Sequence, residues 1–397
     1  VIYPFASFDD VIPLSSPGQS INVKGNYVVT EQITIPHSLH IQGSFNCEIK
    51  YASWSHLNGD IIRHSGSAND TVVFKDILFR NGPSSMSGIP GYDSPASDFA
   101  SLWAGTETSD GGAIRIENCT KPLLRESRAE GGLRGFRLQD CGVNGGGFVI
   151  ENQSIGNLES GIYLAAGGTH YGCQNITVTI NYSAYNANNG ILTIGGINNK
   201  LSQNEIYKNW NAGACAWGTS NYTLRDSGIY DNNRSEFNGI GNTGDAKAGV
   251  QINDAYNLLG TNITYNPDFR FIAEILDTQI HYTGAGSNTK KVGILVTSAV
   301  GNIPYNVKNI IKIDDVGFID QDIAIDLSEV NTTNLKVMLG DNSFVNVKEV
   351  NVKQPVTGYY SELPYSNHVT NVKELDIRVD TLKKFIALHE GLGGPVL

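Results

Sequence analysis

The sequence has 397 residues, enough for two or three ordinary domains, and its 28 basic and 39 acidic side chains give a net charge of −11. This balance disfavours nucleic-acid phosphates as a ligand, and an acidic polymer would require a local basic patch. No stretch is long and apolar enough to cross a bilayer, so no membrane insertion is expected. The five cysteines include no CxxC or CxxH pair, so we expect neither a complete disulfide framework nor a metal site, and no cofactor.

Short alternating strands recur along the chain, and each is entered by a small residue. They are Ala113-Ile-Arg-Ile, Gly135-Phe-Arg-Leu, Gly161-Ile-Tyr-Leu, Gly190-Ile-Leu-Thr, Gly213-Ala-Cys-Ala, Gly249-Val-Gln-Ile and Gly293-Ile-Leu-Val. Such alternation is typical of half-buried strands. With an apolar core, the inward side chains are Phe136, Leu138, Ile162, Leu164, Val250 and Ile252, and the outward ones are Arg115, Arg137, Tyr163, Leu192, Cys215 and Gln251.

A second ladder, of two apolar residues followed by an asparagine at a fixed spacing, recurs between these strands. Leu201 is followed by Ile206 and then by Asn209, and the same steps occur at Leu224, Ile229 and Asn232, at Leu258, Ile263 and Asn266 and, with a substitution, at Ile180, Tyr185 and Asn188. Self-similarity at a period of about twenty to forty residues indicates a repeat architecture. Brief strands and Asn-rich corners predict an all-β fold, a right-handed parallel β-helix (solenoid), with coils stacked about 4.8 Å apart. Cys119 and Cys141, one repeat apart, are predicted to be buried stacking residues.

Insertions lengthen some of the predicted coils. We assign residues 1–350 to the β-helix, with an N-terminal cap and three long loops at 81–112, 233–248 and 267–292. Each loop precedes one of the short alternating strands, which together form a first ladder of stacked strands. The loops would therefore wall the outward face of the sheet formed by this ladder into a groove. Loops raised on a rigid solenoid commonly carry function.

The pattern changes in residues 351–397, which we predict to be a short C-terminal helical or oligomerisation segment. Apolar residues follow steps of three and four at Val372, Leu375, Val379, Leu382 and Ile386. This is a heptad seam of fewer than three heptads. Two interpretations remain open: one amphipathic helix packed on the last coil, or self-association of several chains.

Carboxylates lie near the predicted groove. Asp110, Glu130 and Glu159 precede the ladder strands of three successive coils, so neighbours would lie about 5 Å apart. Glu236 and Asp245 lie in an inserted loop, and Glu274 and Asp277 in the next. Two carboxylates at such separations suit glycoside hydrolysis. The candidate catalytic residues are therefore Asp110, Glu130, Glu159, Glu236 and Asp245.

The same face offers groups that bind sugars. The candidates for substrate binding are Arg115, Arg137, Tyr163, His170 and Trp217. Aromatic rings stack on sugar faces, and arginine binds uronate or acetyl oxygens. A lyase would instead use Tyr163 or His170 as its base, with Arg137 neutralising the acid group of the substrate.

A β-helix with long loops over one face, an acidic balance, few cysteines and a short C-terminal heptad seam resembles a bacteriophage tailspike. Tailspikes are trimers that bind, and often cleave, a host surface polysaccharide. The resemblance implies a homotrimer in a virion tail, acting outside the host cell on a bacterial surface polysaccharide. It carries over no catalytic residue. Coil-like sequence begins by about Ser20, so we expect the virion-binding head of a tailspike to be missing.

Alternatives remain open beside a depolymerase that hydrolyses glycosidic bonds. Pectate-lyase-like enzymes share the solenoid, but the sequence lacks their signature runs and the paired-Asp motifs of polygalacturonases. A polysaccharide lyase on the same scaffold is one alternative. A non-enzymatic receptor-binding or adhesin solenoid, for example a secreted one, is the other.

Overall fold

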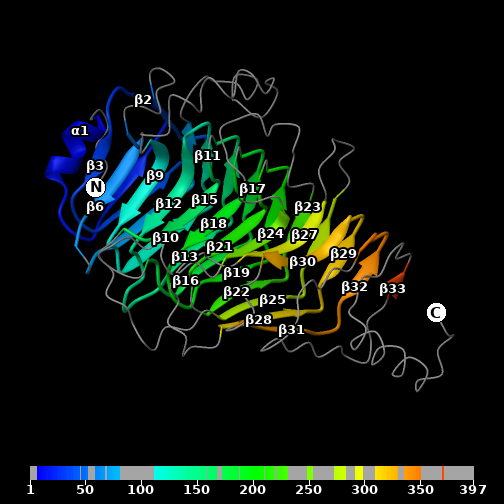
Figure 1. The fold of residues 1–397 in the computed structure, drawn as a ribbon. Helices are drawn as coiled ribbons and strands as arrows, with labels where there is room; N and C mark the ends of the chain where they lie inside the picture. Colours follow the sequence, from blue (N-terminus) through cyan, green and yellow to red (C-terminus); the bar gives the residue numbers. More distant parts are fainter. Residues whose placement is uncertain are drawn as a thin grey trace, which may run out of the picture.

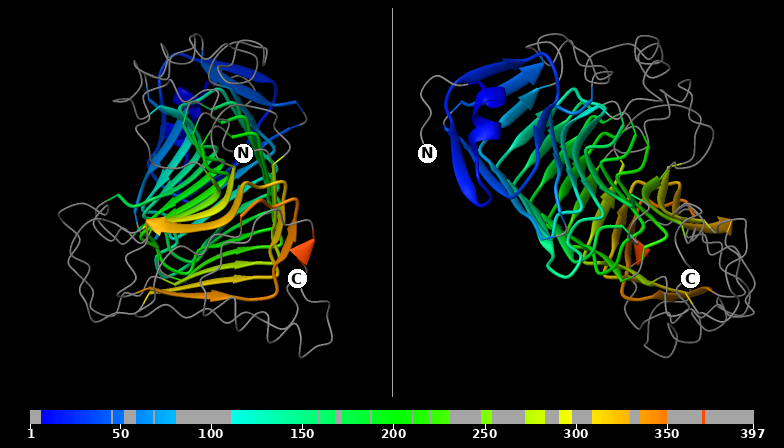
Figure 2. Two further views of the ribbon diagram at one scale, coloured as in Figure 1. Left: turned by 45° about the vertical axis from the view of Figure 1, so that its right-hand side comes forward. Right: turned by 90° about the vertical axis from the view of Figure 1, so that its left-hand side faces the viewer.

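The chain winds into coils whose strands form three parallel sheets (Figure 1). The computed structural model describes residues 7–44, 46–51, 59–67, 69–80, 111–157, 159–167, 172–186, 188–209, 211–219, 221–230, 248–253, 272–282, 291–297, 309–329, 335–349 and 369–370. Each full coil contributes one strand to every sheet. The coils stack along one axis, from the N-terminal helix α1 (Phe8–Val11) to β32 and β33 at the other end (Figures 1 and 2).

The three sheets are named here by their strands. Sheet A contains β1 Gln19–Val23, β4 Leu39–Gly43, β7 Thr71–Lys75, β10 Lys121–Arg125, β13 Gly147–Ile150, β16 Ile176–Thr179, β19 Lys200–Ser202, β22 Tyr222–Arg225, β25 Ile272–Leu276, β28 Asn309–Asp314 and β31 Leu335–Leu339. Sheet B contains β2 Asn26–Val29, β5 Glu48–Tyr51, β8 Leu78–Arg80, β11 Arg128–Glu130, β14 Gln153–Ile155, β17 Tyr182–Ala184, β20 Glu205–Tyr207, β23 Gly228–Tyr230, β26 Gln279–His281, β29 Gly317–Ile319, β32 Ser343–Val345 and β33 Val369–Thr370. Sheet C contains β3 Ile33–Ile35, β6 Ile62–Ser65, β9 Gly112–Glu117, β12 Arg134–Gln139, β15 Ile162–Ala165, β18 Ile191–Ile194, β21 Ala214–Trp217, β24 Ala248–Asn253, β27 Val292–Thr297 and β30 Ile323–Glu329.

Sheet C is the first ladder of the sequence analysis. The predicted inward stack is confirmed, because register partners run from Phe136 through Ile162, Ile191, Ala214 and Val250 to Ile294, all fully buried. The entering glycines are required by close packing. A Cβ at Gly161 would lie 2.2 Å from the Ser183 hydroxyl oxygen, so only glycine fits there. The fold is therefore the predicted right-handed parallel β-helix.

Hydrogen-bonded asparagine ladders run along the Asn-rich corners of the coils. The side-chain amide of Asn157 donates to the Asn186 side-chain oxygen at 2.8 Å, and Asn186 donates in turn to Asn209 at 2.9 Å. These ladder residues are fully buried. A second buried ladder joins Asn152, Asn181 and Asn204. Stacked amides thus satisfy backbone groups at corners that have no strand partners.

The second ladder was predicted in the wrong register in two coils. The register partners of Leu201 and Ile206 in the preceding coil are Val178 and Ser183, not Ile180 and Tyr185. Ile180 is 49% exposed at a left-handed corner. The serine explains the error: the Ser183 hydroxyl donates to the carbonyl of Gly190 at 2.7 Å, so a polar residue occupies a position where an apolar one was expected. Asn186, and not the predicted Asn188, is the residue of this coil that bonds Asn209 in the buried ladder.

In a later coil the partners of Leu224 and Ile229 are Ile275 and Ile280. The sequence pattern predicts Leu258 and Ile263 at these positions instead. The residues Leu258, Ile263, Asn266 and Asn232 lie outside the described residues. The chain between β24 and β25 therefore enters sheet A, not sheet C. Of the predicted loop 267–292, residues 272–276 and 279–281 form β25 and β26.

The cysteines pack as predicted. Cys119 and Cys141 are buried and free, and Cys173 is buried one coil further on. Burial raises the pKa of the Cys119 thiol to about 12 and raises that of Cys141 well above its usual range. Neutral thiols at this corner suit a packing role.

The N-terminal end of the solenoid consists of a short helix and a 3₁₀ turn. Ser7 and Asp10 form a capping box on α1, which the 3₁₀ turn Ile12–Leu14 follows, and Phe8 and Val11 pack into the core. No helix in the described part of the chain is long and apolar enough to span a membrane. The seam from Val372 to Ile386 lies outside the described residues.

Candidate functional site

The outer face of sheet C carries one continuous column of side chains. Register pairs join Arg63, Arg115, Arg137, Tyr163, Leu192, Cys215 and Gln251 from β6 to β24. This confirms that the six predicted outward residues share one face, and that Tyr163 lies outside the main core. The inferred coil spacing of about 4.8 Å brings successive side chains of the column into contact range.

The middle of this column is shielded from water. Leu192, Ala212 and Cys215 form a buried cluster separate from the main core, and Tyr163, Ile194 and Trp217 pack against it. Gln251 is 1% exposed. The predicted outward residues Leu192, Cys215 and Gln251 are therefore buried although they lie outside the main core, and their removal from water stabilises this part of the face.

The N-terminal part of the column is cationic. Glu117 accepts from Arg63 Nε at 2.8 Å and pairs with Arg115 Nη2 at 2.6 Å. The Gln139 side-chain oxygen accepts from Arg115 Nη2 at 3.1 Å and from Arg137 Nη2 at 2.7 Å. Glu117 and Gln139 are register partners in β9 and β12. Alternation alone predicts this second row, because each of its members follows an arginine of the column by two positions.

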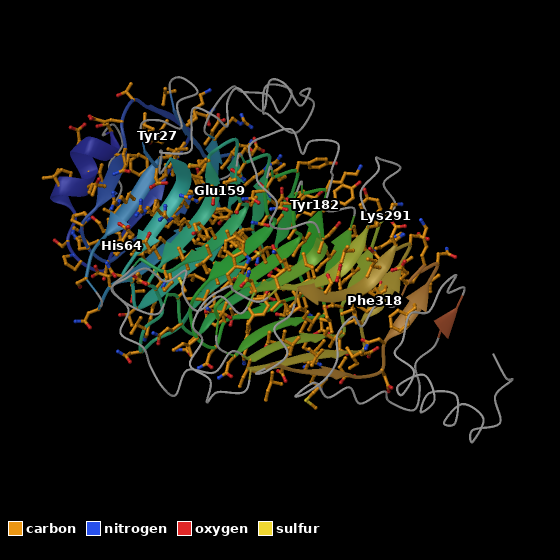
Figure 3. The ribbon with its side chains drawn as sticks, viewed as in Figure 1. Tyr27, His64, Glu159, Tyr182, Lys291 and Phe318 are labelled. Atoms are coloured by element: carbon orange, nitrogen blue, oxygen red, sulfur yellow. The ribbon has the colours of Figure 1, made fainter. Side chains whose placement is uncertain are left out.

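Tyr163 connects this cationic part to the corner that precedes β15. The guanidinium carbons of Arg134 and Arg137 lie 5.0 and 5.6 Å from the centre of its ring. Arg134 Nη2 also forms an ion pair with Glu159 at 2.5 Å. Figure 3 shows Glu159 in the N-terminal half of the stack, near β12 and β15. Cation–π contacts of this kind orient guanidinium groups and occupy the ring.

Glu130 lies at a different place, on sheet B. It is 1% exposed, accepts from Arg80 Nε at 2.9 Å and forms an ion pair with Arg128. Arg80 also bonds Glu48, through Nη1, at 2.7 Å. The result is a chain of alternating charges in which Glu48, Arg80 and Glu130 are largely shielded from water and Arg128 is 40% exposed.

The expected stacking of Glu130 and Glu159 is wrong. The register partner of Glu130 in the next coil is Ile155, whereas the backbone N–H of Glu159 donates to the carbonyl of Leu133. The two carboxylates belong to different columns: Arg80 and Arg128 pair with Glu130, and Arg134 pairs with Glu159. Sequence position before a ladder strand did not identify the corner on which each residue lies.

The other predicted residues fall into three groups. Asp110, Glu236, Asp245 and His170 lie outside the described residues, as do most of the loops 81–112 and 233–248. Trp217 lies on the outer face beside Cys215, and its indole N–H finds no acceptor among the described residues. Glu274 and Asp277 lie on sheet A and at its corner, where Asp277 pairs with Arg225 at 3.1 Å, and not beside sheet C.

Sheet B carries an aromatic row that was not predicted from the sequence. Tyr207, Tyr230 and His281 are register partners in β20, β23 and β26. Tyr185 meets Tyr207 edge to face at 5.6 Å, and Tyr230 meets His281 at 6.5 Å. The misplaced register at Tyr185 concealed this row. It stabilises neighbouring coils through aromatic contacts.

The described residues include no group of three or more His, Cys, Asp or Glu side chains arranged to hold a metal ion. The outer face of sheet C and its neighbouring corner present guanidinium groups, carboxylates and aromatic rings. This set suits recognition of a hydroxylated or acidic polymer.

No protein-family model matches the sequence, and comparison with curated proteins finds no match. Among solved structures, a polygalacturonase from Erwinia carotovora ssp. carotovora superposes with a TM-score of 0.55 at 10% identity, over 93% of this chain and 93% of that protein. The Dettilon tailspike protein gives 0.44 at 11% identity over 88% of this chain, which spans 61% of the tailspike. A family 28 exopolygalacturonase from Yersinia enterocolitica gives 0.48 at 9% identity, over 93% and 76% of the two chains. At these identities the likeness establishes the fold, a right-handed parallel β-helix.

Proposed function

We propose that the chain binds a bacterial surface polysaccharide along the outer face of sheet C and cleaves it by hydrolysis of a glycosidic bond, as a bacteriophage tailspike or a related depolymerase does. The observation that carries the proposal is the first part of the column, in which three successive coils each contribute a guanidinium group, at Arg63, Arg115 and Arg137, and the next coil contributes the ring of Tyr163. A repeating polymer is matched by a surface that repeats at a fixed interval.

The placement of chain insertions supports the same face. The chain between β8 and β9, between β23 and β24 and between β26 and β27 enters sheet C after extra residues. Two of these segments carry Asp110, Glu236 and Asp245, so the working carboxylates are drawn from these three residues together with Glu159. One would act as general acid and one as base or nucleophile.

A lyase is the second candidate, and Tyr163 favours it. Its ring lies beside two guanidinium groups, those of Arg134 and Arg137. A phenol next to cations suits removal of a proton from a uronate, whose carboxylate the arginines would neutralise. β-Elimination leaves an unsaturated sugar at the new chain end, whereas hydrolysis leaves a saturated one.

One experiment separates the possibilities. The protein is incubated with purified capsular and O-antigen polysaccharides, and new reducing ends and ultraviolet absorbance are followed together. Hydrolysis releases reducing ends without a rise in absorbance, and elimination produces both. Binding without either signal would identify a receptor-binding or adhesin solenoid. No binding to any polymer would reject the proposal.

We also propose that the working form is a homotrimer in a virion tail, held in part by the seam from Val372 to Ile386. Val at one seam position and Leu at the next lean toward two strands in an isolated coiled coil, so the trimer rests on the tailspike resemblance. Light scattering should give the mass of three chains at micromolar concentration. Deleting residues 371–397 should reduce that mass, and a monomeric full-length chain would contradict the proposal.

A further inference from the structure

The side chain of Tyr230, on the outer face of sheet B, lies over its own strand. A Cβ atom at Gly228, two residues earlier in β23, would lie 2.4 Å from both the Cε2 atom and the hydroxyl oxygen of Tyr230. Gly228 has the extended backbone of a strand, which any residue adopts, so glycine is required here for space. The ring therefore occupies the space above Gly228. It is half-buried, so part of its surface meets solvent.

One side of this ring is bounded by His281. His281 is the register partner of Tyr230 in β26, and the two ring centres lie 6.5 Å apart with their planes at 84°. His281 Nε2 lies 3.0 Å from a carboxylate oxygen of Asp320, and the Asn346 side-chain amide donates to the other oxygen of Asp320 at 3.0 Å. These bonds hold the imidazole in place, so it forms a fixed wall beside the Tyr230 ring.

Polar side chains flank the ring along the solenoid axis. The register partners of Gly228 are Glu205 in the preceding coil and Gln279 in the following coil, and both are exposed. The ring above Gly228 thus has a carboxylate on one side and an amide on the other, each about one coil spacing of 4.8 Å away along the sheet. We call Tyr230, His281, Glu205 and Gln279 the Tyr230 platform.

The neighbouring ring of Tyr207 has a different environment. Lys208 Nζ lies over this ring, 4.8 Å from its centre, and Tyr185 meets it edge to face at 5.6 Å. A cation over the face of Tyr207 occupies the surface on which a ligand would stack. Tyr230 is therefore the ring of this row that suits a ligand.

We propose that the Tyr230 platform is a second carbohydrate-binding site, separate from the face of sheet C, and that it takes a neutral hexopyranose unit of a polysaccharide. A pyranose ring has C–H groups on its face, which pack on an aromatic ring, and hydroxyl groups around its edge. The Glu205 carboxylate accepts hydrogen bonds from hydroxyl groups, and the Gln279 amide both accepts and donates them.

The same chemistry disfavours other ligands. The carboxylates of Glu205 and Asp320 repel an acidic sugar. An apolar protein surface laid on Tyr230 would cover Glu205 and Gln279 without offering them hydrogen-bonding partners, which is costly. The proposal does not require that sheet C bind or cleave the same polymer.

The test uses immobilised neutral O-antigen polysaccharides with hexopyranose repeat units, with acidic capsular polysaccharides for comparison, and measures binding of the full chain by interferometry. Tyr230→Ala should weaken binding of a neutral polymer by about tenfold, and Tyr230→Phe, which keeps the ring, should bind as wild type. Gly228→Ala should keep the fold, because the atoms nearest the added methyl group all belong to the end of the Tyr230 side chain. It should weaken binding as well, since the ring is displaced.

Phe148→Ala is the matched control, because Phe148 is an aromatic residue on sheet A that is 51% exposed. It should bind as wild type, and thermal unfolding establishes that each variant is folded. Binding that Tyr163→Leu weakens and Tyr230→Ala does not would place the polymer on sheet C alone, which overturns the inference and leaves the proposed function intact. The reverse pattern supports the inference and speaks against sheet C.

Three further outcomes would overturn the proposal. The first is that no neutral polymer binds, or that acidic polymers alone bind. The second is that folded Tyr230→Ala and Gly228→Ala variants bind as wild type. The third is that Tyr230→Ala lowers the mass measured by light scattering without changing polymer binding, since this face would then join two copies of the chain.

Discussion

The guanidinium carbon of Arg137 lies 5.6 Å from the centre of the Tyr163 ring, and the two residues are direct register partners in β12 and β15. Arg134 approaches the same ring at 5.0 Å. Sequence analysis suggested that this ring stacks on a sugar. The geometry gives it another role: it positions two cations on the outer face.

Replacing Tyr163 with Leu should therefore disturb the arginines more than the fold. Each cation–π contact contributes about 0.5 to 1 kcal/mol at a partly exposed site, so the loss of two contacts should weaken polysaccharide binding by about fivefold to thirtyfold. Tyr163→Phe keeps the ring and should bind as wild type. Interferometry on both variants checks this. Equal losses in the two would instead point to the hydroxyl, as a lyase base requires.

Ile162, next to Tyr163, points into the solenoid and is fully buried. Ile162→Asp would place an unpaired charge in an apolar core and should prevent stable folding or cost several kcal/mol, about 4 or more. Ile162→Val removes one methylene and should cost about 1 kcal/mol. Thermal midpoints of the two variants measure the contrast. A soluble Ile162→Asp variant with an unchanged midpoint would contradict the inward register.

Asn186 holds the middle of a buried ladder. Its side-chain oxygen accepts from the backbone and side chain of Asn157, and its amide donates to Asn209. Asn186→Ala leaves these partners unsatisfied and should cost about 2 to 4 kcal/mol. The control is Asn211→Ala, since Asn211 makes a comparable 2.7 Å bond to Asn188 where water can replace it. Its effect should stay below about 1 kcal/mol, and similar midpoints for both variants would refute the role of burial.

Sequence alone predicted the solenoid because alternation survives wherever strands pack one face inward. Phe136, Ile162 and Val250 were placed correctly for that reason. Registers failed where a core position is polar, as at Ser183, whose hydroxyl is satisfied locally by the carbonyl of Gly190. The ion pair of Arg63 and Glu117 joins residues 54 positions apart in sequence. No local pattern encodes such a pair, because the length of the intervening coil, including its insertion, decides which residues meet.

His64 is a titratable group inside the solenoid, 3.2 Å from the Asp70 carboxylate. Burial lowers the pKa of His64 below 6.5 and outweighs the nearby carboxylate, which acts to raise it. For Asp70, burial acts to raise the pKa, but hydrogen bonds from Ser67, Ser38 and His64 leave it below 3.8.

His64 and Asp70 both make the folded protein less stable as the pH falls. Near pH 6.5 the unfolded chain takes up a proton on His64 that the folded protein does not, so stability is full above that pH and is lost as the pH falls below it. Asp70 adds a further loss below about pH 3.8. Thermal midpoints from pH 8 to pH 5 should therefore decline below about pH 6.5, and His64→Gln should flatten this decline. Parallel curves for wild type and variant would exclude His64 as its source.

The last prediction separates structural carboxylates from catalytic ones. Glu130 is buried between Arg80 and Arg128, so Glu130→Gln breaks a buried ion pair and should cost about 3 kcal/mol of stability. Turnover per folded molecule should change little, because Glu130 lies on β11 of sheet B and not on the outer face of sheet C. Glu159 pairs with a single arginine and is less enclosed, with a side chain 14% exposed.

A true general acid or nucleophile behaves in the opposite way to Glu130: its amide variant loses two or more orders of magnitude in turnover, about 3 kcal/mol of transition-state stabilisation, while fold and binding persist. Amide variants of Asp110, Glu130, Glu159, Glu236 and Asp245, each assayed for thermal midpoint, binding and reducing-end release, assign the roles. We expect Glu130 to fall in the structural class and the catalytic loss to appear among the other four. If a folded Glu130→Gln variant loses turnover at an unchanged midpoint, its ion pairs position it for catalysis, and its assignment as structural is wrong.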